Sequence, residues 1–266
     1  MNIHSTSKAL FYSSFERSLY LLQLDETHHR ANGPSMLIVS LDKQFDVLDT
    51  VGNKQLTYSL LIPSGVPITI KTNRAQAAIC YLKNTGSDFK KLIPLMANQI
   101  KIDSKNSLFS HVKFEELIRA QAKAVWRDSP KACDVLQQLD ELINTFDALH
   151  NKNINYQADA RVIKVIDIIT KNLTLNISVN EMATEVGLST SRLSQLFRAE
   201  TGTSIRTFRL WQRVFFTARC LQSGMSLTDA AITAGFADYG QFFRVYKEMG
   251  GRLPGKAKIQ TIIKSG

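Results

Sequence analysis

One pattern of small, apolar and helix-capping residues occurs twice near the C-terminus, and this repeat constrains the fold more than any other feature of the sequence. In the first copy, Ala183 is small enough for two helices to cross closely, and Gly187 suits a turn that needs a positive φ. Ser178 with Glu181 forms a candidate capping box, and Ser189 is a candidate N-cap. Apolar residues occupy the interhelical positions, namely Met182, Val186, Leu188, Leu193 and Leu196. The pattern predicts a helix-turn-helix unit.

The second copy follows 48 residues later, with Ala231 in place of Ala183 and Gly235 in place of Gly187. Capping pairs again precede its helices, Ser226 with Asp229 and Asp238 with Gln241. Its apolar residues after the turn fall one position later than in the first copy, at Phe242, Val245 and Tyr246. We therefore expect a second helix-turn-helix unit whose turn is one residue longer.

The segment between the copies, residues 204–222, has apolar residues at helical spacing and predicts one long connecting helix. At 1.5 Å per residue such a helix spans roughly 28 Å, similar to the ~34 Å between two major-groove faces one DNA turn apart. Two helices held at its ends are therefore spaced to enter successive grooves on one side of a duplex.

Positive charge is concentrated in the same part of the chain. Residues 160–266 contain 15 Lys and Arg against 7 Asp and Glu, a net charge of +8, whereas residues 1–159 contain 18 against 16, a net charge of +2. A basic domain attached to a nearly neutral one is typical of a protein that neutralises nucleic-acid phosphates with one domain. The excess of positive charge alone is also consistent with a solvated surface, so the interpretation as a DNA-binding domain depends on the repeat.

Residues 162–254 resemble the AraC family of bacterial transcription regulators. The resemblance rests on SRLSQLFRAETG at 191–202, on Arg213 with Ala218 in the connecting helix, and on AGFADYGQFFRVYK at 234–247. It implies docking in two grooves of promoter DNA, a cupin-like N-terminal domain that senses a small-molecule effector or dimerises, and activation or repression, with RNA polymerase as a partner of an activator. The chain departs from the family after Pro254, where Gly255 to Lys258 replace the usual ending.

The resemblance and the predicted outward faces together identify candidate contacts with DNA. Base contacts are expected from Ser191, Arg192, Ser194 and Gln195 in the first unit and from Tyr239, Gly240, Gln241 and Arg244 in the second. Phosphate contacts are expected from Arg198, Arg206, Arg209 and Lys247. The alternative for each is a solvated helix face. Gln241 is equally a capping partner of Asp238, and Arg244 suits either a guanine or a phosphate.

The N-terminal part reads as β structure, so the fold class is α+β. Six short apolar runs between residues 18 and 82, separated by turn residues such as Gly33-Pro34, predict a sandwich or barrel, and LLIPSGVPITI at 60–70 resembles cupin-like sensor domains. We expect a β-barrel over 1–106, a helical region over 107–150, a linker over 151–160 and the helix-turn-helix domain over 161–266. Whether the barrel binds a small molecule or only dimerises stays open.

The sequence favours a regulator over an enzyme. A metal-dependent cupin needs a cluster of His ligands, but Ile68 follows Pro67 where such a ligand would stand, and His28 with His29 reads as surface loop. We expect no metal and no cofactor. Three scattered cysteines, Cys80, Cys133 and Cys220, read as reduced core thiols, which also disfavours a DNA-repair methyl acceptor with a reactive cysteine. A nucleoid protein that binds DNA without sequence preference remains an alternative.

Residues 131–150 predict a helix with one apolar stripe: Val135, Leu139, Leu142, Phe146 and Leu149. We expect a homodimer through this stripe, although the stripe could instead pack on its own barrel. Glu16 and Arg17 interrupt the only apolar stretch near the N-terminus, which argues against a secretory signal and predicts a cytoplasmic protein.

Overall fold

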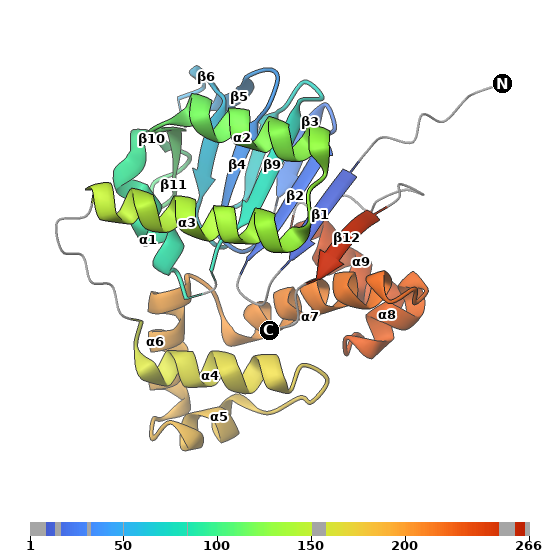
Figure 1. The fold of residues 1–266 in the computed structure, drawn as a ribbon. Coiled ribbons are helices and arrows are strands. Elements are labelled where there is room, and N and C mark those ends of the chain that lie inside the picture. The colour runs from blue at the N-terminus through green and yellow to red at the C-terminus, as the bar shows by residue number, and fades with distance from the viewer. Residues whose placement is uncertain are drawn as a thin grey trace.

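The computed structural model describes residues 9–13, 17–30, 33–49, 51–83, 85–150, 158–249 and 259–263. It has a sheet-rich N-terminal domain and a helical C-terminal domain, as expected, and the two lie against each other (Figure 1). No helix among these residues is long and apolar enough to cross a membrane.

Two separate β-sheets form the N-terminal domain. All six predicted strands are present, and β1, β3, β6, β10, β11 and β12 are additional. The eight-stranded sheet has the order β10 (Met96–Lys101), β11 (Ser107–Val112), β7 (Ser59–Ile62), β4 (Met36–Ser40), β9 (Gln76–Tyr81), β2 (Ser18–Gln23), β1 (Ala9–Ser13), β12 (Ile259–Ile263). The four-stranded sheet has the order β3 (Thr27–Arg30), β8 (Ile68–Lys71), β5 (Phe45–Leu48), β6 (Lys54–Thr57).

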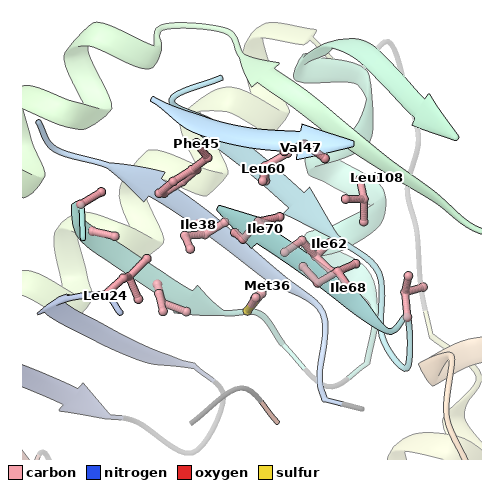
Figure 2. Close-up of a cluster of buried hydrophobic side chains, with 14 of the residues drawn as sticks. Leu24, Met36, Ile38, Phe45, Val47, Leu60, Ile62, Ile68, Ile70 and Leu108 are labelled. Atoms are coloured by element: carbon pink, nitrogen blue, oxygen red, sulfur yellow. The ribbon is translucent and has the colours of Figure 1, made fainter. Parts of the chain in front are cut away.

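The prediction of a closed barrel is therefore wrong. No strand pair joins the two sheets among the described residues, so each sheet keeps its own edges. The sheets instead stack and bury apolar side chains between them, including Met36, Ile38, Phe45, Leu60 and Ile70 (Figure 2). Burial of these faces supplies the main favourable free energy of the domain without ring closure.

Three helices pack on the eight-stranded sheet: α1 (Ser87–Leu92), α2 (Glu115–Asp128) and α3 (Ala132–His150), with a 3₁₀ turn, η1 (Ile93–Leu95), after α1. In Figure 1, α2 (green) and α3 (yellow-green) cross this sheet, and they pack on the face that carries Leu37 and Val39, opposite the face that packs Met36 and Ile38 against the four-stranded sheet. The helical region begins at Glu115 rather than at 107, because residues 107–112 alternate buried and half-buried positions and form strand β11.

The apolar stripe predicted on residues 131–150 is the face of α3 that packs on its own sheet. Val135 is buried with Leu21 and Leu41, and Leu139 and Leu142 pack against the cluster that contains Leu61. The side chains of Phe146 and Leu149 lie outside the described residues. Dimerisation through this stripe stays a prediction, and these contacts favour the alternative that it packs within one chain.

The C-terminal domain consists of α4 (Ala160–Lys171), α5 (Val179–Glu185), α6 (Thr190–Thr201), α7 (Ile205–Gln222), α8 (Leu227–Thr233) and α9 (Tyr239–Glu248). Its two apolar clusters share α7: Ile205 and Phe208 pack with α4, α5 and α6, whereas Trp211 and Val214 pack with α8 and α9. The expectation that this domain is helical throughout is wrong at its end, because β12 joins the N-terminal sheet parallel to β1 (Figure 1).

The expected ending of the C-terminal domain, Pro254 to Lys258, and most of the predicted linker, residues 151–157, lie outside the described residues. Cys80 and Cys220 are buried and free, as expected, and the side chain of Cys133 is not described.

Candidate nucleic-acid interface

The first helix pair, α5 and α6, has the local geometry that its sequence predicts. The Ser178 hydroxyl accepts from the Glu181 amide at 3.1 Å, and the Glu181 carboxylate accepts from the Ser178 amide at 2.7 Å, which completes the capping box. Ser189 caps α6 by accepting from the Arg192 amide. Gly187 has φ +66°, a conformation that L side chains rarely adopt. Local sequence alone therefore sets where α6 begins.

The outer face of α6 is polar and open to solvent. Ser191, Arg192, Ser194 and Gln195, for which we predict base contacts, are all exposed, as is Arg198, a predicted phosphate contact. Leu193 and Phe197 on the opposite face are fully buried and anchor the helix. The Ser194 hydroxyl donates to the Thr190 carbonyl at 2.8 Å, so it is engaged within the helix itself. The contacts with DNA stay predictions.

The second helix pair, α8 and α9, repeats this geometry with the longer turn that we predicted. Residues 234–238 connect α8 to α9, against residues 186–189 between α5 and α6. Asp238 caps α9 by accepting from the Gln241 amide at 2.7 Å. The Gln241 side-chain carbonyl accepts from the Ala237 amide at 2.9 Å, one residue before the expected partner. Gln241 is therefore a capping residue in this structure, which weakens its candidacy for base contact.

Tyr239, Gly240 and Arg244 on α9 are exposed, and Tyr239 stacks on Phe243 with ring centroids 6.0 Å apart. The two arginines predicted to contact phosphate on α7 differ. Arg206 is exposed. Arg209 donates from Nη2 to the Ile177 carbonyl at 2.5 Å and has a buried Nε without a hydrogen-bond partner, so it serves the packing of α7 on the α4–α5 loop.

A cavity of about 580 Å³ lies between the N-terminal domain and α9. Strands β2, β3 and β9 contribute its lining on one side, and α9 contributes Phe243, Arg244 and Lys247 on the other. Arg244 and Lys247 are predicted contacts with DNA, so the face of α9 for which we predict DNA contacts also lines this cavity. The sequence contains no signal of this arrangement, because β3 and α9 lie at opposite ends of the chain.

The N-terminal side of this interface carries a buried histidine and a buried arginine. His28, expected in a surface loop, lies in β3 and is 8% exposed, with a buried Nε2 that has no hydrogen-bond partner. Burial, with smaller contributions from Arg30 and His29, lowers the pKa of His28 to about 4. Arg30 is 2% exposed and bonds only carbonyl groups, among them Pro34 O at 2.5 Å, which leaves Nε and Nη1 without partners. Burial lowers its pKa to about 10.

In each helix pair, the C-terminal end of the second helix contacts the N-terminal domain. Glycines of the N-terminal domain permit the close approach of the two backbones. A Cβ on Gly33 would lie 3.3 Å from Met249 Cα, just after α9, and the Tyr81 hydroxyl donates to Met249 O at 3.4 Å. A Cβ on Gly86 would lie 2.6 Å from Glu200 O in the last turn of α6. The N-terminal domain therefore contacts both α6 and α9.

The family profile described as "Helix-turn-helix domain" matches residues 182–258. The Msm operon regulatory protein of Streptococcus mutans is 28% identical over 124 residues, which cover 46% of this chain and 45% of that protein. The Arabinose operon regulatory protein of Escherichia coli is 33% identical over 126 residues, which cover 46% of this chain and 42% of that protein. The match thus spans less than half the length of either relative.

Solved structures of ToxT from Vibrio cholerae share the fold. One has a TM-score of 0.54 at 10% identity and covers 88% of this chain and 94% of that chain. Another, with an unsaturated fatty acid bound, has a TM-score of 0.53 at 13% identity and covers 94% of both chains. The likeness extends over both domains, whereas the sequence relatives match less than half of the chain. With the helix pairs, caps and turns described above, these matches support an assignment of the helix-turn-helix region to the AraC family of bacterial transcription regulators.

Proposed function

We propose that this protein is a sequence-specific DNA-binding transcription regulator, in which α5–α6 and α8–α9 are two helix-turn-helix units. The observation that carries the proposal is the repeat itself: two helix pairs with matching caps and turn glycines end in α6 and α9, which expose Arg192 and Arg244. α7 has 18 residues, about 27 Å at 1.5 Å per residue, near the ~34 Å between successive major-groove faces.

The proposed activity is binding and regulation, without catalysis. A regulator of promoters works beside the chromosome, which in a bacterium is in the cytoplasm. Dimerisation and contact with RNA polymerase are part of the proposal, because the resemblance to the AraC family implies them.

The cavity beside α9 is our proposed effector site. Its lining is mostly apolar and aromatic, including Tyr20, Leu24 and Phe243, and His28 adds a buried ring nitrogen without a partner. Such a lining suits a small molecule with an apolar body and a polar head. The structural neighbour ToxT holds an unsaturated fatty acid, and we propose an effector of that general chemistry here.

The experiment that tests the proposed function is selection of genomic DNA fragments by the purified full chain, followed by sequencing. We expect one enriched motif with two half-sites, and an affinity that falls steeply, by orders of magnitude, between 50 and 200 mM salt if about six or more phosphates are neutralised. Retention of DNA without an enriched motif would point to a nucleoid protein, and no retention would refute the proposal.

Two variants with matched loss of charge sharpen this test. Arg192→Ala removes an exposed cation from the proposed reading face, whereas Lys171→Ala removes an exposed cation from α4, where Lys171 pairs with Asp167 at 2.8 Å. We expect the first to change the enriched motif and the second to leave it unchanged. If both variants select the same motif as the wild type, Arg192 does not read bases.

A further inference from the structure

One buried arginine lies where the two helix pairs of the C-terminal domain meet. Arg213 is near the middle of α7 and is 6% exposed. It lies between Phe208, which packs with the first pair, and Val214, which packs with the second. Arg213 thus lies at the boundary between the two apolar clusters of the domain, which meet along α7.

The guanidinium of Arg213 holds the loop before α5. Its Nε donates to the Leu173 carbonyl at 2.9 Å, and its Nη2 donates to the Asn176 side-chain carbonyl at 2.9 Å. Both acceptors are neutral, and burial lowers the pKa of Arg213, with a smaller contribution from Arg209. Two donors on one rigid plane fix the orientation of the group, which a flexible side chain with a point charge cannot do.

The same guanidinium also touches the turn of the second pair. A Cβ on Gly235, between α8 and α9, would lie 3.0 Å from Arg213 Nε and 3.2 Å from Leu173 O. Gly187 stands at the equivalent position in the first turn, and a Cβ there would meet nothing within 4 Å. Both glycines have a positive φ, so the turn alone accounts for Gly187, whereas Gly235 also serves close packing against Arg213.

We propose that Arg213 is a positioning residue for DNA recognition: it locks the second turn against the α4–α5 loop and thereby sets the separation at which α6 and α9 meet DNA. The inference rests on the proposed function and adds to it the residue that determines half-site spacing. Without the guanidinium, the angle between the pairs would depend on α7, on its flanking apolar contacts and on the contacts of the N-terminal domain with α6 and α9.

The test measures spacing preference with the full chain. The selected DNA site is rebuilt with one or two base pairs added or removed between its half-sites, and affinity is measured for each version and for a single half-site. Arg213→Lys keeps the charge but loses the planar fork. We expect its preference for the native spacing to fall about tenfold, comparable to losing one hydrogen bond to a charged group, with little change on the half-site.

Two further variants keep the result interpretable if Arg213→Lys folds poorly. Asn176 is exposed, so Asn176→Ala removes one acceptor without opening the core, and we expect a smaller loss of spacing preference. Gly235→Ala and Gly187→Ala both place an L side chain at a positive φ, +90° and +66° respectively, but only the first introduces a Cβ against Arg213. We expect loss of spacing preference from Gly235→Ala alone.

Three results would overturn the inference. One is a folded Arg213→Lys or Asn176→Ala protein with wild-type spacing preference. Another is an equal loss of affinity on every spacing and on the half-site, which indicates general destabilisation. The third is equal effects of the two glycine variants. A wild-type protein that selects no DNA motif would instead refute the proposed function itself, and the inference with it.

Discussion

The two predicted reading helices share their local construction but differ in their surroundings. α6 presents Arg192 and Gln195 to solvent, and among the described residues it meets the N-terminal domain near its last turn, at Gly86 and Lys90. α9 presents Arg244 and Lys247 to a cavity that the N-terminal domain completes. If both helices read DNA, α6 is accessible to DNA in this conformation. The face of α9 instead lies beside the N-terminal domain, which we propose binds an effector.

This difference indicates that control by the N-terminal domain would act mainly through the second unit. A conformational change in β3 would alter its packing beside α9, because both elements line the cavity. It would affect α6 through the contacts at the end of that helix. We therefore expect the two units to be separate in stability and the N-terminal domain to affect α9 more than α6.

The largest expected effect comes from removing the aromatic anchor of one unit. Phe242 is 3% exposed, and its ring lies 5.5 Å from that of Phe236 and 5.6 Å from that of Tyr246, measured between centroids. Phe242→Ala should lower the free energy of unfolding by about 3–5 kcal/mol through loss of burial and a new cavity. Hydrogen exchange should accelerate in α8 and α9 and stay near wild type in α4 to α6.

Phe197→Ala is the matched change in the first unit, because Phe197 is fully buried and its ring centroid lies 5.4 Å from that of Phe208. It should give the reverse pattern of exchange. If either variant accelerates exchange equally in both units, the two apolar clusters are one cooperative unit and the comparison between the helices loses its basis.

A pH-dependent loss of stability is expected on the side of α9. Burial lowers the pKa of His28 to about 4, from 6.5 in the unfolded chain. Neutral His28 therefore favours the folded state above pH 6.5, and this contribution is lost as pH falls toward 4, by up to about 3 kcal/mol. Urea unfolding at pH 7 and pH 4.5 measures the loss.

His28→Leu isolates this contribution from the titration of carboxylates, since all other groups are unchanged. The variant should lose less stability than the wild type between the two pH values. Equal losses in the two proteins would mean that His28 is not held neutral by burial against α9.

A smaller effect is expected from Gly33→Ala at the docked end of α9. The new Cβ would lie 2.9 Å from Arg30 Nε and 3.3 Å from Met249 O, so α9 or Arg30 must shift. Overpacking of this kind costs about 1–3 kcal/mol. We expect faster hydrogen exchange at the C-terminal end of α9, with α6 as the internal control. Unchanged exchange at both helices would show that Gly33 does not hold the interface.

The elements set by local chemistry could be predicted from the sequence. Ser178, Ser189 and Asp238 each accept from the amide three residues on, and the turn before α9 has its predicted extra residue, because caps and positive-φ turns depend on near neighbours. Trp211, within α7, and Phe236, in the turn before α9, are both buried.

The features that join distant segments could not be predicted. His28 is buried where β3 lines the cavity beside α9, and the engagement of Arg209 with Ile177 O depends on the loop before α5. The open sandwich depends on strand edges such as β3, whose polar sequence THHR has no apolar alternation to mark it. Nothing in the local pattern distinguishes these outcomes from a surface loop, a free cation or a closed barrel.

The most direct test of the account is a base-by-base affinity map of the selected DNA site for the wild type, Arg192→Ala and Arg244→Ala. The account predicts that each variant loses roughly 1–3 kcal/mol of discrimination at one or two base pairs, and that the two affected positions lie about 10 base pairs apart. A uniform loss with a salt slope lower by about one would instead make that arginine a phosphate clamp. Uniform losses from both variants, or losses at the same base pairs, would contradict reading of DNA by two separate helices.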